Sequence, residues 1–529
     1  MAAGALPLEC VDYSDLRALD RPGDCARFRV NFALPGGRST DCRVPGGDYR
    51  AAADSWLLIS ITSQALFWIV MKNTLTQSVI VTLVLLAIPA MALPAMADQN
   101  NQTHLLRSGR KPGDVDRVAV VLEVGGELKE MVDNKVHRPK LSVVCSLTYD
   151  EKTLEVPVAA DGRARSVRHY DKIDAVIKVE DEGLKPTLRA QRQLIAAEAE
   201  GGKLTLFSPL GTLSRDELEL INILGNSLLL DRLLPAQPVA VGDSWKQSDK
   251  LILAMFRLDA AAKVDVASKL TEVTDQVARF EMSGHVEGAS GGVSTTIDLK
   301  AKYRFNLATK RIDWLGLLAK EDRDIGHVTD GVDATARLQV QVAPHDAAAE
   351  LNDAALAGLS LEPSNDLTQL VYKPKSGDWQ FVHDRSWHVT GDRADLAVLR
   401  MLDRGDLLAQ CNVAPLPKRE PGGQLSLAEF QADVQKSLGD SFGEFVEAGQ
   451  AANEANYRVH RVVVRGKVED LPIQWNYYLV ADQHGNQVVF AFTVEQSLAE
   501  RLGKADEKLV GALRFLAPQT AEKETEGLR

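Results

Sequence analysis

Apolar and polar residues alternate along most of the chain beyond residue 115, a pattern typical of half-buried β-strands. The first run, residues 115–124, ends at Gly125-Gly126, a pair that favours a turn. Further strands are predicted at residues 140–149, 153–158, 164–179 and 203–207, and residues 188–198 fit either a strand or a helix. Asp150-Glu151-Lys152 separates two of these runs, so we expect it to form a hairpin turn.

A second set of alternating runs predicts a β-meander between residues 261 and 342. Its strands are expected at residues 264–273, 277–286, 293–307, 311–321 and 334–342, with a tight hairpin at residues 308–310. Several runs exceed the usual strand length of about five or six residues, so we expect a long, curved sheet.

One amphipathic helix is predicted between the two sets of strands. Ser214 and Glu217 have the spacing of a capping box, in which each side chain bonds a backbone amide of the first turn. Leucine and isoleucine then recur at helical spacing as far as Leu229. This helix should cover one face of the sheet, and the following loop, residues 234–245, should press Trp245 against the core.

The pattern changes after residues 344–366, a linker rich in Ala, Asp, Asn and Ser. Shorter strands are predicted at residues 370–372, 386–389, 394–401, 407–413, 443–448, 457–464, 473–480 and 488–494. Ser426 and Glu429 form a second capping box at the start of a helix over residues 426–438. A last amphipathic helix is expected at residues 499–516, followed by a charged tail, residues 517–529.

The C-terminal block, residues 367–516, resembles the PsbP-like family. The resemblance lies in the order strands, helix, strands, helix, in Trp379-Gln380-Phe381, and in the closing FAFTVEQSL and LVGALRFL segments between residues 490 and 516. It implies an α/β/α sandwich around an antiparallel sheet, with no enzymatic activity to inherit. The block at residues 98–343 resembles, in outline only, the LolA-like curved-sheet lipid carriers of the bacterial envelope. The fold class we predict is therefore α+β.

Residues 71–97 read as a secretory signal peptide. One lysine precedes an apolar run, and Ala95 and Ala97 fit an A-x-A cleavage site before Asp98. We therefore expect a periplasmic or secreted protein. Residues 1–70 are interpreted as an upstream extension, mistranslated or disordered, because their first 54 residues hold seven arginines and no lysine. In the alternative, residues 55–97 anchor the chain in the membrane.

The net charge of −12 belongs to the exported part, because residues 1–97 contain eight acidic and eight basic side chains. An acidic surface repels nucleic acid, so we expect no nucleic-acid partner. Cys145 and Cys411 are the two cysteines beyond the leader, and we expect two buried, reduced thiols rather than a long-range disulfide. Contact with the membrane is expected only through an uncleaved leader.

Candidate catalytic and metal-binding groups are few. Gly288 to Gly292 spell G-x-S-x-G around Ser290, but strands flank the motif on both sides, which favours a hairpin turn over a nucleophile. His383 and His388 have no third ligand at useful spacing, and His388 is expected on a surface or edge strand. We predict no enzyme, no cofactor and no metal site.

Aromatic residues gather in the C-terminal block, and exposed aromatics make good anchors for a partner. Trp379, Trp387 and Tyr478 are the candidate interaction residues, although packing into the core is the more common role of such side chains. Strand periodicity places Trp475 and Tyr477 on one face and Tyr478 on the other, which makes Tyr478 the candidate for a solvent-facing role.

Three functional hypotheses follow. The first is an exported, non-catalytic protein of the cell envelope or exterior with a binding or assembly role toward an unidentified protein or apolar small molecule. The second is a carrier that holds an apolar ligand or lipid in a cavity of the curved sheet. A serine hydrolase that uses Ser290 ranks last.

Overall fold

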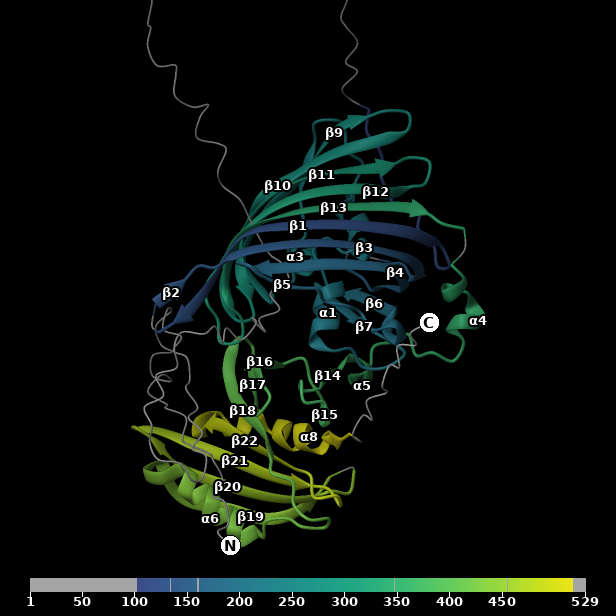
Figure 1. Cartoon of the computed structure of the whole chain (residues 1–529). Helices are drawn as coiled ribbons and strands as arrows, with labels where there is room; N and C mark the ends of the chain where they lie inside the picture. Colours follow the sequence, from purple (N-terminus) through teal and green to yellow (C-terminus); the bar gives the residue numbers. More distant parts are fainter. Residues whose placement is uncertain (1–101, 134, 159–160, 347, 454, 517–529) are drawn as a thin grey trace, which may run out of the picture.

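The computed structural model describes residues 102–516 except 134, 159–160, 347 and 454 (Figure 1). Within this part of the chain the strands pair antiparallel throughout the named sheets, and the helices are short. A 13-stranded sheet takes its strands from residues 115–344, and sheets of seven and three strands take theirs from residues 370–515. The predicted combination of antiparallel sheets with a minority of helix is confirmed. No helix among the described residues is both long and apolar enough to span a bilayer.

The large sheet joins the two predicted sets of strands in one curved layer (Figure 1). Its order is β7-β6-β4-β3-β1-β13-β12-β11-β10-β9-β8, with β2 beside β1 and β5 beside β4. The strands are β1 Val115–Val132, β2 Lys135–His137, β3 Lys140–Glu155, β4 Ala164–Val179, β5 Glu182–Leu184, β6 Leu194–Glu200, β7 Lys203–Phe207, β8 Ser244–Lys246, β9 Ala260–Val273, β10 Val277–Ser290, β11 Val293–Asn306, β12 Arg311–Arg323 and β13 Gly331–Pro344. The predicted meander is confirmed as β9 to β13.

Strand β1 continues through Gly125-Gly126, so the turn predicted there is wrong. A Cβ atom on Gly126 would lie 1.6 Å from the Cβ of Ala334 on β13. The glycine therefore allows two paired strands to approach closely and does not change the direction of the chain.

The turn predicted at Asp150-Glu151-Lys152 is also wrong, because β3 runs through it without a break. Glu151 is buried, and its Oε1 accepts hydrogen bonds from Arg168 Nε at 2.8 Å and from Ser166 Oγ at 2.7 Å. Burial alone would raise the pKa of the Glu151 carboxyl, but the nearby arginines, led by Arg168, outweigh burial and lower it. Glu151, which the sequence pattern places in a solvated turn, is thus one member of a buried ion pair with Arg168.

The predicted helix is confirmed at its start and divided further on. Ser214 and Glu217 form the capping box of α1, Arg215–Ile221. The chain then leaves the helix and begins again as α2, Ser227–Leu230, because Gly225 has a positive φ of 62° and lies against Leu338 of β13. A third helix, α3, Asp249–Phe256, was not predicted.

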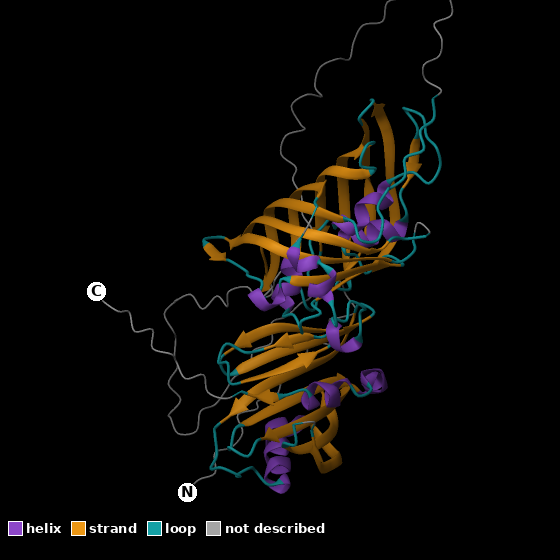
Figure 2. Cartoon of the chain, turned by 90° about the vertical axis from the view of Figure 1, so that its right-hand side faces the viewer, coloured by secondary structure: helices purple, strands orange, loops and turns teal. Residues whose placement is uncertain are grey.

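Helices α1 to α3 cover one face of the large sheet (Figure 2). Their buried leucines, isoleucines and methionine join the inward residues of the strands in a single core cluster. Trp245 packs edge-on against Phe280, which stacks on Tyr303. The expected placement of Trp245 against the core is confirmed.

The segment after β13 forms three short turns of helix: η5, Ala349–Leu351; α4, Asp353–Leu356; and α5, Asn365–Thr368. Leu351 is buried and joins a small cluster with Val167 of β4. The segment expected to be a linker therefore packs partly against the first sheet.

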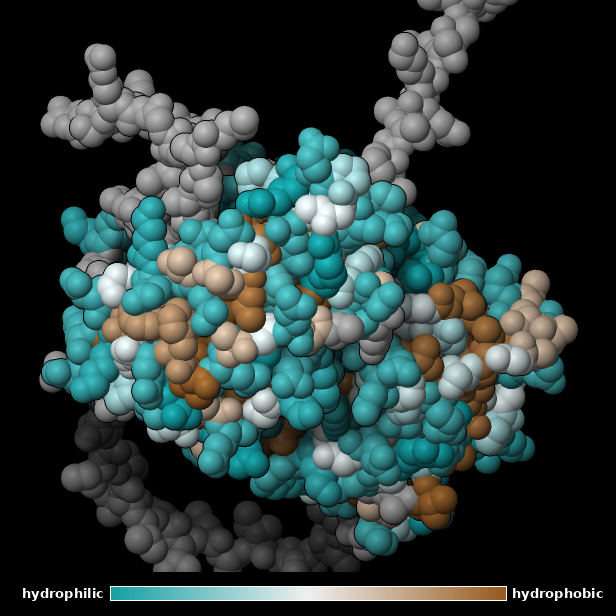
Figure 3. Space-filling model, turned by 90° about the horizontal axis from the view of Figure 1, so that it is seen from below, coloured by the Kyte–Doolittle hydropathy of each residue, from teal (hydrophilic) through white to brown (hydrophobic). Residues whose placement is uncertain are grey.

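The C-terminal strands form a seven-stranded sheet, β16-β17-β18-β22-β21-β20-β19, and a small sheet, β14-β15-β23. The strands are β14 Leu370–Tyr372, β15 Trp379–His383, β16 Trp387–Arg393, β17 Leu396–Asp403, β18 Asp406–Leu416, β19 Phe442–Ala452, β20 Arg458–Val468, β21 Leu471–Ala481, β22 Gln487–Glu495 and β23 Arg514–Phe515. Helix α6, Leu427–Leu438, covers one face with the predicted capping box at Ser426. Viewed from this end, the molecule is mostly hydrophilic with separate hydrophobic patches (Figure 3).

The other face of the seven-stranded sheet packs against the small sheet and two short helices, α7, Ala499–Leu502, and α8, Ala505–Gly511. One continuous helix over residues 499–516 was expected, and that expectation is wrong. Gly503 interrupts it with a positive φ of 58°, and the chain then extends to pair with β15.

Three arginines join the C-terminal part to the large-sheet part by donating to backbone carbonyls. Arg215 Nη2 bonds the carbonyl oxygen of Arg385 at 2.7 Å, and Arg385 Nη2 bonds that of Leu206 at 2.6 Å. Arg400 Nη1 bonds the carbonyl oxygen of His327 at 2.5 Å. Guanidinium groups and backbone oxygens, rather than paired side-chain charges, therefore form much of this joint.

Glu321 is a fully buried carboxylate on the helix-covered face of β12. Neither carboxylate oxygen accepts a hydrogen bond from any described residue, and Arg323 Nη1 lies 3.8 Å from Oε1. Burial raises the pKa of Glu321 to about 8, with Arg323 and Arg257 opposing the rise. Glu321 is thus held as a neutral acid at pH values where an exposed glutamate is charged.

Candidate functional site

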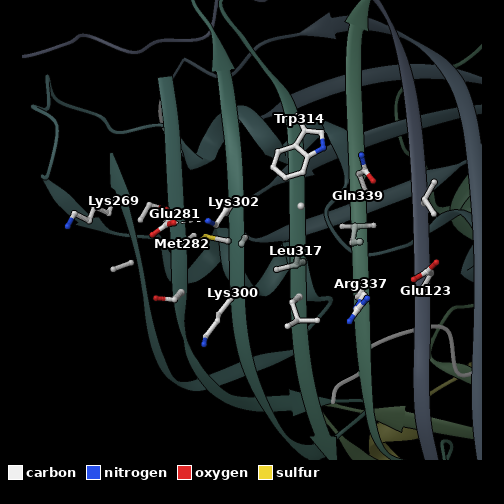
Figure 4. Close-up of a pocket in the computed structure, with 18 of the residues that line it drawn as sticks. Glu123, Lys269, Glu281, Met282, Lys300, Lys302, Trp314, Leu317, Arg337 and Gln339 are labelled. Atoms are coloured by element: carbon white, nitrogen blue, oxygen red, sulfur yellow. Dashed lines mark ion pairs between the residues drawn. The ribbon is translucent and has the colours of Figure 1, made fainter. Parts of the chain in front are cut away.

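The strongest candidate site lies on the face of the large sheet that the helices leave uncovered. Strand β11 alternates strictly between buried and exposed residues, and β9 and β10 follow the same pattern over most of their length. One set of side chains therefore enters the core while the other set, largely charged, points away from the helices. A hollow of about 970 Å³ crosses β9, β10, β11, β12, β13 and β1 on this face (Figure 4). We call it the outer-face groove.

Strand register arranges the side chains of the groove in two rows that run across the strands. From β9 to β1, the first row is Lys269, Glu281, Lys302, Gly316, Gln339 and Val121. In the same direction, the second row is Ala267, Ser283, Lys300, Leu318, Arg337 and Glu123. Antiparallel pairing places the members of each row side by side, so a ligand lying across the strands would meet them in turn.

Trp314 supplies the aromatic surface of the groove, and Gly316 makes room for it. The two residues are two positions apart on β12 and so share the outer face. A Cβ atom on Gly316 would lie 2.7 Å from Trp314 Cη2, so the indole ring lies over the glycine (Figure 4). Trp314 is half-buried and keeps part of its ring available to a ligand.

The groove is cationic although the whole chain is acidic. Four basic side chains and two acidic ones line it: Lys269, Lys300, Lys302, Arg337, Glu123 and Glu281. Lys302 Nζ pairs with Glu281 Oε1 at 3.0 Å. Among the described residues, Lys269 and Arg337 form no ion pair, and both are exposed. The groove can therefore offer charge-assisted hydrogen bonds to an anion.

The tryptophans proposed as interaction residues are buried instead. Trp379 and Trp387 are each about 2% exposed and belong to the core between the seven-stranded sheet and its helices. The structure thus shows Trp379 and Trp387 packed in the core, which is the more common role of such side chains.

The solvent-facing role predicted for Tyr478 is wrong, because Tyr478 is buried as well. Its hydroxyl donates to Asp506 Oδ2 at 2.8 Å and accepts from Arg461 Nε at 2.9 Å. The predicted alternation is confirmed, with Trp475 and Tyr477 on the α6 side and Tyr478 on the other. Both faces of this sheet are covered, so neither set reaches solvent.

Ser290 ends β10, and the chain turns at Gly291 and Gly292, whose φ angles are 59° and 76°. The predicted hairpin is confirmed. Ser290 Oγ accepts a hydrogen bond from Arg323 Nη1 at 3.4 Å, rather than from a histidine. Within the described residues, the hydrogen bonding of Ser290 therefore gives no support to a role as an activated nucleophile.

The two candidate ligand histidines, His383 and His388, are both held neutral by their surroundings. His383 is buried and His388 is half-buried on β16, an edge strand of its sheet, as expected. Burial, with a smaller effect of Arg215, lowers the pKa of His383 to about 4 and that of His388 to about 3. Among the described residues, no group of three or more His, Cys, Asp or Glu side chains is placed to hold a metal ion.

Cys145 and Cys411 are both buried and unpaired, as predicted. Burial raises the pKa of the Cys145 thiol to about 12 and also raises that of Cys411. The cleavage-site residues Ala95, Ala97 and Asp98 lie outside the described residues.

In comparisons with known proteins, parts of the chain are similar to solved structures. No family model matches the chain, and no curated protein matches it. Cyanobacterial PsbP (CyanoP) from Synechocystis sp. PCC 6803 is 14% identical over 28% of this chain and 92% of its own, with a TM-score of 0.23. The protein of unknown function PA94 from Pseudomonas aeruginosa is 8% identical over 28% of this chain and 97% of its own, with a TM-score of 0.20.

Lipovitellin is 8% identical over 45% of this chain and 26% of its own length, with a TM-score of 0.28. At these scores the likenesses establish neither a family nor a function for the chain. The structural neighbours include a PsbP-like protein over about a quarter of the chain.

Proposed function

We propose that the chain is an exported, non-catalytic binding protein of the bacterial cell envelope or exterior, and that the outer-face groove is its binding site. The observation that carries the proposal is the groove itself, in which Trp314 lies over Gly316 and the same hollow is lined by Arg337 and Lys269 from other strands. Concave sites that combine an apolar surface with a few polar groups are where proteins bind their ligands.

The lining favours a ligand that is both anionic and partly flat. Arg337 and Lys269 can each donate to an acidic group, and the excess of cations attracts negative charge from solution. Trp314 can pack against an apolar ring face, with Leu318 and Val121 extending the apolar surface. Gln339 adds an uncharged donor and acceptor.

The helix-covered face offers less support to a carrier of apolar ligands. Side chains from α1 to α3 pack directly against the strands there, and most of the strand residues that face them are buried. A carrier would need an apolar cavity between these layers. Lipid that co-purifies with the protein would favour the carrier over the present proposal.

A PsbP-like identity for residues 367–516 remains part of the proposal. It is supported by the element order, in which strands β14 to β18 precede α6, strands β19 to β22 follow it, and α7 and α8 come after them. Under this proposal the C-terminal part has an assembly role and no catalytic one.

Binding can be tested by isothermal titration of the full chain with dextran sulfate, polygalacturonate and uncharged dextran, at low salt and at about 0.15 M salt. The acidic polymers should bind, and dextran should not. Arg337→Gln and Trp314→Ala should each weaken binding by about tenfold, the first through loss of one charge-assisted hydrogen bond and the second through loss of aromatic packing. Lys263→Gln, on the same face outside the groove, should leave binding unchanged.

The proposed site would be refuted if neither Arg337→Gln nor Trp314→Ala changed the affinity, or if no probe bound the protein. Circular dichroism and thermal melting of each variant establish that it is folded before the comparison is made.

Export is tested separately by intact-mass and N-terminal analysis of the protein from its native host. A mature chain that begins at Asp98 would support a cleaved leader at residues 71–97. A stable protein that retains residues 1–70 would overturn export by cleavage and favour the membrane-anchored alternative.

A further inference from the structure

Cations in the outer-face groove occur on every second strand. Lys269 lies on β9, Lys300 and Lys302 on β11, and Arg337 on β13. Neighbouring strands are about 4.8 Å apart, so these cationic columns repeat at about 10 Å across the sheet. Figure 4 shows the columns side by side, with Lys269 and Arg337 on opposite sides of Lys300 and Lys302.

The strands between the cations carry a different chemistry. Strand β12, between the columns on β11 and β13, presents Trp314, Gly316 and Leu318. Strand β10, between β9 and β11, presents Glu281 and Ser283. A ligand that crosses the groove therefore meets positive charge, then an uncharged or acidic stretch, then positive charge again.

From this spacing we infer that the ligand is an acidic polysaccharide that carries one carboxylate on every second sugar ring and lies across the strands. An extended chain of pyranose rings advances by about one strand spacing per ring, so alternate rings fall on alternate strands. Along the second row, carboxylates would then meet Lys300 and Arg337, while the intervening ring packs on Leu318. Along the first row, a carboxylate would meet Lys302 and the next ring would pack on Trp314, which lies over Gly316. This inference rests on the proposed binding function.

Other polyanions fit the same columns less well. A nucleic-acid strand carries a phosphate on every nucleotide, about every 3.4 Å of axis within a duplex, and an extended acidic peptide advances about 3.3 Å per residue. Both would place negative charge beside Glu281 and Glu123, which lie within the two rows. Like charges placed side by side across strands are destabilising, so these carboxylates select against dense polyanions.

The test compares four probes by isothermal titration of the full chain. A hyaluronate octasaccharide carries a carboxylate on every second ring, and a polygalacturonate octasaccharide carries one on every ring. Oligodeoxythymidylate supplies a dense polyanion of another class, and maltooctaose supplies an uncharged chain of equal length. We expect the hyaluronate octasaccharide to bind at least about tenfold more tightly than each of the others.

Matched variants tie that preference to the groove. Arg337→Gln and Trp314→Ala should each weaken hyaluronate binding by about tenfold, whereas Lys263→Gln should not change it. Glu281→Gln should reduce the difference in affinity between the hyaluronate and polygalacturonate octasaccharides. The substitution removes a negative charge that repels the more densely charged polygalacturonate. Trp314→Phe provides a conservative test of the aromatic surface if Trp314→Ala does not fold.

The outcomes separate this inference from the proposed function. If polygalacturonate or oligodeoxythymidylate binds as tightly as hyaluronate and the groove variants weaken it, the inference fails and the binding function stands. If no probe responds to Arg337→Gln, both fail.

Discussion

Replacing Glu321 by glutamine should make the protein more stable at alkaline pH and leave its stability nearly unchanged at pH 5. The carboxyl is buried on β12 without a hydrogen bond from any described residue, so its charged form is costly there. Glutamine keeps the shape of the side chain and removes the ionisation. The change therefore isolates the effect of a buried negative charge.

The size of the effect follows from the pKa. Burial raises the pKa of Glu321 from its ordinary 4.5 to about 8, so the folded state holds the proton more tightly than the unfolded state. The stability gained from that proton is fully present below pH 4.5 and is lost as the pH rises through 8. At about 1.4 kcal/mol per pH unit, the loss amounts to about 5 kcal/mol at most.

Thermal melting of the parent and the Glu321→Gln variant at pH 5, 7 and 9 measures this difference. For a domain of this size each kcal/mol moves Tm by about 2–4 °C, so the two melting curves should separate by about 10–20 °C at most at pH 9. Glu272→Gln, an exposed substitution on β9, serves as the control and should shift Tm little at any pH. A parent whose stability does not fall between pH 5 and 9 relative to Glu321→Gln would refute the reasoning.

Three further predictions concern single positions. Gly316→Ala places a Cβ 2.7 Å from the Trp314 ring, so the ring must move; titration should show polysaccharide binding weakened by about tenfold, with the fold retained. Arg168→Met leaves Glu151 buried without its partner and should cost about 3–5 kcal/mol in urea denaturation, whereas a loss below about 1 kcal/mol would contradict a buried pair. Burial raises the pKa of Cys145 to about 12, so at pH 8 the thiol should resist a disulfide reagent until the chain unfolds, and rapid labelling of the folded protein would contradict its burial.

Much of the secondary structure could be predicted from residue patterns. Alternation located β9 to β13 because each of these strands has one buried and one exposed face, and the capping boxes at Ser214 and Ser426 marked the starts of α1 and α6. The failures occurred where tertiary contacts decide. The sequence around Gly126 favours a turn, but in the fold this glycine lies against Ala334 of the neighbouring strand. Glu151 resembles a solvated turn residue in the sequence, but in the fold it pairs with Arg168.

The groove could not be predicted in the same way. Lys300, Trp314 and Arg337 lie on three strands, and each looks like an ordinary exposed residue within its own strand. Only the pairing of β11 with β12 and of β12 with β13 brings them together, and a single sequence does not contain that register. The one local signal was Trp314, an aromatic residue two positions before a glycine within a strand.

The arginine contacts between the two parts of the molecule bear on how the chain can diverge. Arg215, Arg385 and Arg400 all donate to carbonyl oxygens, and every residue type supplies a carbonyl oxygen at the same place on the backbone. Substitution of Leu206 or His327, which accept through their carbonyl oxygens, would leave these bonds intact as long as the local backbone path is kept. At this joint the three arginine side chains are therefore more constrained in substitution than the side chains of Leu206 and His327.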